Sequence, residues 1–555
     1  MLHLYDADAP VETRVRFLTE QLLAREDVRR WRHALEQEVS RPEIALDQLT
    51  PSPSALVSVL ERMGIASALR RVVIDLHCEA TREVEAARAQ QAKHEEEALL
   101  PELARSGPSA SSLDVVLQAK ETWERVTREE LLRFAREQGK PLVVANTNPV
   151  RSARDGAESS ASASAEMALP ADPEPKRSYK PPASTRFLYD ANDLLHTLQG
   201  IKPPNRSGPH ALPEWGSIRL QFATPSAAEL RRRYAELSPS VGQIGLDDLF
   251  PAERQAFLAD KHRVGDVVVS HRSVAMARQY AKTGCPASLR PVLWQHALAQ
   301  SVSDASRQYF QQLQDQVTRW TFVTDDMYLL DLQHAVDDSD YFVFQDLLDS
   351  VMLAFTRDAH VQREAVRING AVELPAELSD GALNGLVPPN GVLPFSGLVM
   401  YAAPLTYLYT DDVALYFVFR EMYVCYWSRL NAIDAPESSI LSLCQLFERL
   451  VQRSSPRAVF RLLDVGVRPL DLAFPWIQSA FSGVLEIQQL LLLWDRVVGY
   501  DSIEVLAVAA AALFHFRAED LETTVTRLED ARALFAELID IRIVPLLQEY
   551  LFLLR

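Results

Sequence analysis

Apolar residues recur along most of this chain at the spacing of three to four residues that is typical of an α-helix. Val15, Leu18 and Leu22 keep this spacing near the N-terminus, and from Gly284 onward nearly every segment reads as an amphipathic or buried helix. The long runs show no strand alternation, so the pattern predicts an all-α protein. The helices expected in the C-terminal half cover residues 341–355, 397–409, 413–430, 440–452, 457–463, 474–481, 487–498 and 503–517.

Short breaks that contain glycine or proline separate these helices. The residues expected to interrupt them are Gly391, Pro436, Gly466, Pro469, Gly483 and Gly499. Proline also favours the first turn of a helix, because its missing N–H would be unpaired there in any case. Pro251 is therefore predicted to begin a helix.

Changes in composition along the chain predict its organisation. Residues 11–140 read as helices, including an Ala- and Glu-rich one at 80–100, whereas residues 187–222 are Pro- and Gly-rich and predict irregular structure or a few strands. Between them, Ser, Ala and Pro predominate and too little apolar surface is present to order the segment. The expected parts are a helical N-terminal region at 1–145, a disordered linker at 146–186, a shoulder at 187–283, a main helical domain at 284–502 and closing helices at 503–555.

Composition and charge restrict the class of protein further. With 555 residues and 48% apolar content, the chain has enough material for two or more domains. Its net charge of -18 argues against broad affinity for nucleic acid or an anionic membrane surface. Four scattered cysteines show no metal-ligand spacing, and neither a signal peptide nor a membrane-spanning run is apparent. These features predict a cytoplasmic protein with reduced thiols and no metal of its own.

Several aromatic and charged residues in the C-terminal half keep a recognisable order and spacing. Arg290 precedes Trp294 by one helical turn, Trp476 precedes Phe481, and the pair Trp494-Asp495 follows an apolar run. Together they resemble the TBC domain, an all-helical module that acts on Rab small GTPases, over roughly residues 284–500. Tracts outside that range, such as residues 41–44, resemble one divergent branch of the family. The residues matched to family motifs are Arg290, Trp294, Asp325, Gly397, Trp476, Phe481, Trp494 and Asp495.

The resemblance implies two catalytic side chains that this sequence lacks. A Rab hydrolyses GTP slowly, and a TBC domain is understood to supply an Arg from an Ile-x-x-Asp-x-x-Arg motif and a Gln from a Tyr-x-Gln-Gly motif. If Asp325 or its neighbour Asp326 stands for the motif Asp, the Arg position holds Tyr328 or Leu329. The Gln position holds Ser396, whose hydroxyl is shorter than a carboxamide and chemically different.

Substitute residues for these positions are few. Arg319 and Arg357 are candidate arginine fingers, although an arginine is more often a solvated or ion-paired surface residue. The acidic residues Asp337, Asp338 and Asp340 lack the ligand pattern of an EF-hand, so they are interpreted as a solvated loop and helix cap.

Three functions remain open from the sequence. The first is a Rab GTPase-activating protein that lacks the usual Arg and Gln and is weak or inactive in GTP hydrolysis. The second is a non-catalytic Rab-binding adaptor whose helical N-terminal region recruits another protein, and the third is a helical scaffold that binds no GTPase. In the first two, the GTP and Mg²⁺ belong to the Rab partner, and any contact with an endomembrane comes through that partner.

Overall fold

The structure is a computed structural model of the whole chain. It describes residues 11–39, 111–145, 187–201, 216–220, 224–246, 251–338, 341–369, 387–433, 439–536 and 541–552, and short pieces between 59 and 76. The predicted linker at 146–186, the predicted helix at 80–100 and the tract 41–44 lie outside the described residues.

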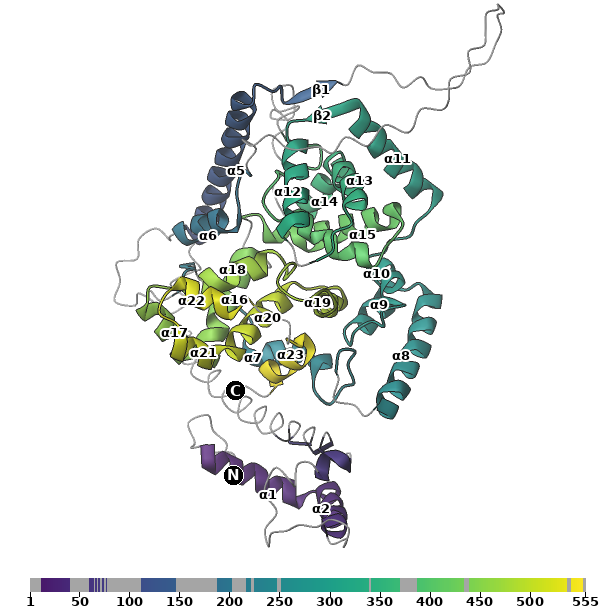
Figure 1. Cartoon of the computed structure of the whole chain (residues 1–555), viewed down its shortest axis with the longest axis vertical. Coiled ribbons are helices and arrows are strands. Elements are labelled where there is room, and N and C mark those ends of the chain that lie inside the picture. Colours follow the sequence, from purple (N-terminus) through teal and green to yellow (C-terminus); the bar gives the residue numbers. More distant parts are fainter. Residues whose placement is uncertain are drawn as a thin grey trace, which may run out of the picture.

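One half of the main body is built from the helices α10 to α15 (Figure 1). Polar side chains cap the N-termini of several of them. The Ser303 side chain accepts the Ser306 N–H at the start of α11, and the Asp411 side chain accepts the Ala414 N–H at the start of α15. The elements of this half are α10 (Arg290–Ala297), α11 (Asp304–Arg319), α12 (Asp325–Asp338), α13 (Gln345–Thr356), α14 (Ala359–Asn369), the 3-10 helices η4 (Val399–Tyr401) and η5 (Ala403–Tyr407), α15 (Asp412–Cys425) and η6 (Trp427–Leu430).

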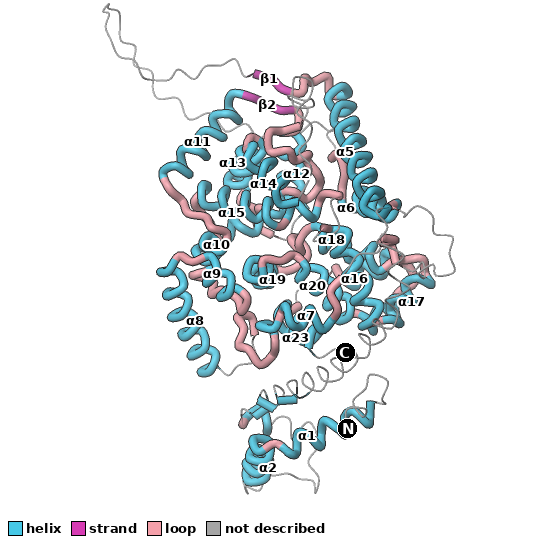
Figure 2. Tube along the Cα trace, turned by 180° about the vertical axis from the view of Figure 1, so that it is seen from behind, coloured by secondary structure: helices cyan, strands magenta, loops and turns pink. Residues whose placement is uncertain are grey.

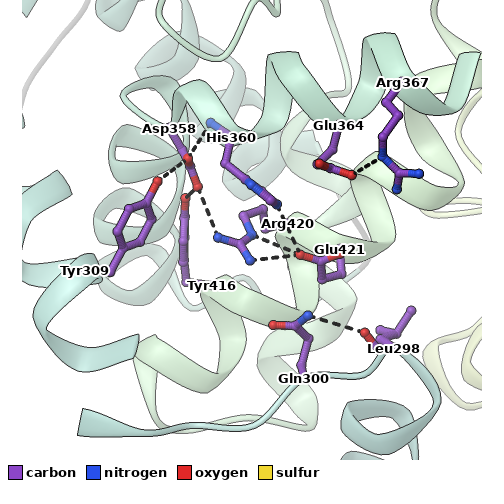
Figure 3. A network of polar contacts seen from close by, with 10 residues as sticks. All are labelled: Leu298, Gln300, Tyr309, Asp358, His360, Glu364, Arg367, Tyr416, Arg420 and Glu421. Carbon is purple, nitrogen blue, oxygen red and sulfur yellow. Dashed lines mark hydrogen bonds and ion pairs between the residues drawn. The ribbon is translucent and has the colours of Figure 1, made fainter. Parts of the chain in front are cut away.

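A buried polar network joins three helices of this half (Figure 3). The Asp358 carboxylate is fully buried and accepts the hydroxyls of Tyr309, at 2.6 Å, and of Tyr416. Arg420 lies 3.5 Å from the same carboxylate and also pairs with Glu421 at 2.9 Å. The network therefore ties α11 and α15 to the start of α14.

The other half surrounds α20, whose residues from Val505 to Phe514 are all buried. A helix that is apolar on every side has to be enclosed by other elements, and here α16, α18 and α23 pack against it. The elements of this half are α16 (Ile440–Ser454), α17 (Pro456–Asp464), α18 (Pro469–Gln478), α19 (Ile487–Tyr500), α20 (Glu504–Phe516), α21 (Ala518–Thr524), α22 (Leu528–Leu534) and α23 (Ile543–Phe552).

The segment before the main body is more helical than its composition predicts. Asp190 accepts the Asn192 and Asp193 amides and so begins a helix within residues 187–222, where irregular structure or strands were expected. The prediction that Pro251 begins a helix is confirmed. The elements here are α6 (Ala191–Gly200), α7 (Ala227–Arg233), η2 (Ala235–Leu237), α8 (Pro251–His271) and α9 (Val274–Ala281).

The N-terminal region contributes α1 (Val11–Ala24), α2 (Glu26–Val39), the long helix α5 (Ser111–Glu137) and the short strand β1 (Val143–Ala145). Strand β1 pairs in antiparallel register with β2 (Trp320–Phe322), with Val144 opposite Thr321. Figure 2 shows this pair at the top of the molecule, between α5 and α11. Apart from this two-stranded pair, the described residues form helices and loops, which confirms the all-α prediction.

Several local predictions need correction. The helix expected at 474–481 is α18, which ends at Gln478, and the one expected at 413–430 is divided into α15 and η6. The helix expected at 397–409 is two 3-10 helices, and residues 341–344 form a loop before α13. Gly499 does not interrupt a helix but lies inside α19, where a Cβ would stand 2.5 Å from the Lys282 backbone nitrogen. Glycine at this position therefore lets α19 approach the end of α9 closely.

Candidate functional site

The first and last family motifs meet at one buried carboxylate. Asp495 on α19 accepts the Arg290 Nε and Nη2 protons at 3.0 Å, the Trp294 indole N–H at 2.9 Å and the Cys285 amide at 2.9 Å. Its side chain is fully buried and that of Arg290 is nearly so, so the charges are paired inside the fold. Arg290 and Trp294 are one helical turn apart, and their guanidinium and indole lie together on this shared acceptor.

Trp494 and the Trp476–Phe481 motif hold a strained turn after α18. Ala480 and Phe481 both have positive φ, at 50° and 66°, a region that residues other than glycine rarely occupy. The Trp494 indole donates to the Ala480 carbonyl at 2.9 Å, and the Phe481 amide donates to the Trp476 carbonyl at 2.7 Å. We call residues 479–485 the supporting turn, because it also contacts the loop that carries Ser396 and Gly397.

The supporting turn and the end of α18 are hydrogen-bonded to the segment that follows Ser396 and Gly397. The Ser482 hydroxyl donates to the Met400 carbonyl at 2.5 Å, and the Tyr401 hydroxyl donates to the Gln478 carbonyl. Residues 394–400, which we call the motif loop, are therefore fixed to α18 at their C-terminal end. Gly397 in this loop has a φ of +93°, and a Cβ there would meet nothing within 4 Å, so conformation rather than space requires glycine.

Asp331 on α12 fixes the middle of the motif loop. Its buried carboxylate accepts the Gly397 and Val399 amides, each at 2.7 Å. Burial raises the pKa of Asp331 to about 6, although these two amides act in the opposite direction. Asp331 was not among the site residues predicted from the sequence. The available sequence signal for a buried functional acid was its isolated position in the apolar run Leu329-Leu330-Asp331-Leu332.

Ser396 is half-buried at the centre of the motif loop. Its amide donates to the Tyr189 carbonyl at 3.1 Å, and the neighbouring Phe395 ring stacks on Tyr189 with centroids 5.4 Å apart. The segment before α6 therefore lies directly against the residue at the predicted Gln position.

The geometry does not support Tyr328 as a finger position. Its side chain is 1% exposed, and its hydroxyl donates to the Val392 carbonyl at 3.0 Å. A residue that reaches a nucleotide on another protein has to be accessible, and Tyr328 faces the interior. His334, which lies one turn beyond Asp331, is exposed and meets the Phe187 ring edge-on at 5.3 Å.

Arg357 is also unsuited to act as a finger. Its side chain is 1% exposed and forms two bonds to the Asp325 carboxylate, at 2.6 and 2.7 Å. It donates further to the Trp320 carbonyl at 2.7 Å and lies over the Phe322 ring. The expectation of a surface ion pair was correct about the pairing but wrong about the surface, since both Arg357 and Asp325 are buried.

Arg319 has a different environment. It is exposed at the end of α11, directly before β2, and within the described part of the chain no ion pair involves it. It therefore remains accessible to a partner, unlike Arg357.

The N-terminal helix α5 contacts the same region of the fold. Trp123 meets Tyr189 edge-on at 4.9 Å, and Tyr189 in turn stacks on Phe395. Farther along α5, Leu131 and Phe134 form a second apolar cluster with residues at the start of α12. Val323 and Met327 are the α12-side members, and Leu188 and Leu393 pack against them. The Lys140 ammonium pairs with Asp326 beside this cluster.

The described residues contain no group of three or more His, Cys, Asp or Glu side chains placed to hold a metal ion. Of the helices the structure describes, none combines the length and apolarity needed to cross a bilayer.

Comparison with known proteins identifies the class to which this fold and motif set belong. Residues 395–521 match the family model described as the Rab-GTPase-TBC domain. The chain is also 38% identical over 377 residues to TBC1 domain family member 19 from Homo sapiens. The matched region covers 66% of this chain and 71% of that protein. The chain belongs to the TBC family of Rab GTPase-activating proteins.

Two solved structures were also found as neighbours. The Chlamydomonas flagellar RabGAP TBC domain has a TM-score of 0.36 at 14% identity and covers 59% of this chain and 96% of its own. The Ypt/Rab-GAP domain of Gyp1p has a TM-score of 0.34 at 13% identity, over 49% of this chain and 90% of its own. At these TM-scores the two structures add nothing to the assignment.

Proposed function

We propose that this protein docks a GTP-bound Rab against the motif loop and α12 and accelerates GTP hydrolysis weakly or not at all. The observation that carries this proposal is the pairing of Asp331 with the Gly397 and Val399 amides. This pairing supports the proposal because it fixes the conformation of the motif loop, while Ser396 supplies no carboxamide.

The same pairing supports a different choice of first finger position. Asp331, rather than Asp325, contacts the motif loop, so we take Asp331 as the Asp of the Asp-x-x-Arg pattern. The residue three positions later is then His334, which is exposed. An imidazole is shorter than an arginine side chain and carries a full positive charge only when protonated. An arginine finger is worth about 10³ to 10⁵ in rate, so its replacement accounts for weak activity.

The test restores the family pattern at both positions. Single-turnover GTP hydrolysis is measured over a panel of Rab proteins with the wild-type chain, with His334→Arg, with Ser396→Gln and with both changes. We expect little acceleration by the wild type and a gain of at least tenfold by the double variant, because the guanidinium and the carboxamide each stabilise the transition state. His271→Arg, on the exposed face of α8, is the matched control.

The hydrolysis rates and Rab binding together distinguish a finger position at His334, one at Arg319 and the absence of Rab docking. If a Rab is bound but the double variant gains nothing, the assignment of His334 is wrong. Acceleration by the wild type that is lost in Arg319→Ala would place the finger at Arg319. Absence of binding to every GTP-loaded Rab would contradict docking itself.

A non-catalytic Rab-binding adaptor is the second candidate function. It is favoured by the burial of Arg357, because the sequestered guanidinium cannot serve as a finger. Under this candidate the wild type binds a GTP-loaded Rab without any acceleration, and another protein binds the helical N-terminal region. In either case an endomembrane location would come from the Rab, which also holds the GTP and Mg²⁺.

A further inference from the structure

Three large aromatic side chains gather on the surface between α12, α13 and η5. Phe342 is 70% exposed, Phe344 is 41% exposed and Tyr407 is 39% exposed. Their rings meet edge-on, with centroids 5.0 Å apart for the two phenylalanines and 5.7 Å apart for Phe344 and Tyr407. We call these residues the aromatic patch. Single exposed apolar residues are ordinary, but contiguous ones mark interaction sites.

The aromatic patch is held in place before any partner binds. The Tyr407 hydroxyl donates to the Phe342 carbonyl at 3.0 Å, which fastens the loop before α13 to η5. The neighbouring Tyr341 hydroxyl donates to the Leu485 carbonyl and accepts the Gly483 amide at 3.1 Å. A rigid aromatic ring loses little conformational entropy on binding, so such residues make effective anchors.

The aromatic patch borders the proposed Rab site through the supporting turn. Gly483 and Leu485 in that turn contact Tyr341, directly before the patch. Ser482 in the same turn contacts Met400 in the motif loop. The supporting turn therefore connects the motif loop to the segment that carries the aromatic patch.

Charge around the aromatic patch indicates the chemistry of its occupant. Two acids that are close to the patch in sequence are exposed: Asp337, near the end of α12, and Asp346, two residues after Phe344 in the first turn of α13. An apolar surface rimmed by basic side chains complements this arrangement. A second copy of this chain would place acid against acid on a molecule of net charge -18, which disfavours a symmetric dimer through the patch.

We infer that the aromatic patch is a docking surface for an apolar area, flanked by basic side chains, on the GTP-bound Rab that the motif loop engages. The inference rests on the proposed function and adds to it. It assigns affinity and selection of the Rab to Phe342, Phe344 and Tyr407, away from the residues that replace the fingers.

The test measures the dissociation constant for a Rab loaded with a non-hydrolysable GTP analogue, with the full-length chain. We expect the double variant Phe342→Ala/Phe344→Ala to bind about 10- to 100-fold more weakly, as truncation of paired aromatic anchors does. Phe460→Ala on α17, where the phenylalanine is 59% exposed, is the matched control and should leave binding unchanged. Asp346→Lys should slow association, with less effect at high salt.

Each outcome separates the two proposals. Wild-type binding that the double variant retains would overturn the role of the aromatic patch and leave the proposed function intact. Equal losses in the Phe342→Ala/Phe344→Ala and Phe460→Ala variants would also overturn it. If the wild type binds no GTP-loaded Rab at all, both proposals fail together.

Discussion

Buried carboxylates that accept backbone amides organise this protein at the scale of single residues. Asp331 accepts two amides of the motif loop, and Glu448 on α16 accepts those of Ser217 and Ile218, at 2.5 and 3.3 Å. Burial raises the pKa of Glu448 to about 7. Each acid is costly to bury while charged, and each fixes a non-helical segment whose amides would otherwise lack partners.

The raised pKa of Asp331 predicts a pH dependence of stability. Its folded value of about 6 exceeds the ordinary value of 3.8, so the folded state holds this proton more tightly than the unfolded state. The contribution of Asp331 protonation to the unfolding free energy is therefore complete at low pH, and it is lost as the pH rises through about 6. The difference in unfolding free energy between wild type and Asp331→Asn should fall by about 2 kcal/mol from pH 4.5 to pH 7.5. Urea titrations at several pH values measure it, and a flat difference would contradict the assignment.

At the scale of elements, the fold depends on a few side chains that join distant helices. Asp495 connects α10 to α19, and Asp358 connects α11 and α15 to α14 (Figure 3). These connections stand between segments that are far apart in sequence. A change at one of them should therefore affect every helix that the side chain joins.

Replacing Asp495 tests this dependence. Asp495→Ala leaves the buried Arg290 guanidinium uncompensated, so the unfolding free energy should fall by about 3 to 5 kcal/mol. Arg307→Ala is the control, because it removes an exposed pair with Asp411 and should cost less than about 1 kcal/mol. Chemical denaturation compares the two. Similar losses would show that the pair at Asp495 contributes no more than a surface contact.

Helix positions were more predictable than the short elements between them. The runs that became α16, α19 and α20 are long and strongly periodic, and the structure places their boundaries within a few residues of those expected. The stretch 397–409 has the same apolar content, but Asp331 and the supporting turn hold its backbone in short 3-10 helices. Such long-range hydrogen bonds leave no local pattern in the sequence.

The candidate site was predictable in part for the same reason. The motif loop with Ser396 and Gly397 was recognised from adjacent residues, and the family assignment is confirmed. The Asp of the Arg motif was taken to be Asp325 or Asp326, whereas Asp331 is the acid that contacts the motif loop and Asp325 binds Arg357 instead. Several acids lie within one helix, and only tertiary contacts distinguish them.

For the whole molecule, α5 is part of the main body rather than a separate arm. It lies beside α12 in both views, and its contacts reach the motif loop through Tyr189 (Figures 1 and 2). A change on α5 should therefore alter the motif loop. This coupling would let a protein that binds α5 influence the Rab site.

Hydrogen exchange can detect the coupling. Trp123→Ala removes the ring that supports Tyr189, whose carbonyl accepts the Ser396 amide. Such a ring pair is worth about 0.5 to 1.5 kcal/mol, so peptides covering 395–399 should exchange up to about tenfold faster. Leu117→Ala, at an exposed position of the same helix, should leave these peptides unchanged. Unaltered exchange in both variants would show that α5 does not support the motif loop.

The pairing of β1 with β2 has a consequence for biosynthesis. Ala145 pairs with Trp320, which is 175 positions later in the chain. At about 5 to 20 residues per second, the ribosome needs roughly 10 to 35 s to make the intervening length. During that interval strand β1 lacks its pairing strand, and Leu131 and Phe134 of α5 lack Val323 and Met327, so this part of the nascent chain completes its packing only after β2 and the start of α12 have been made.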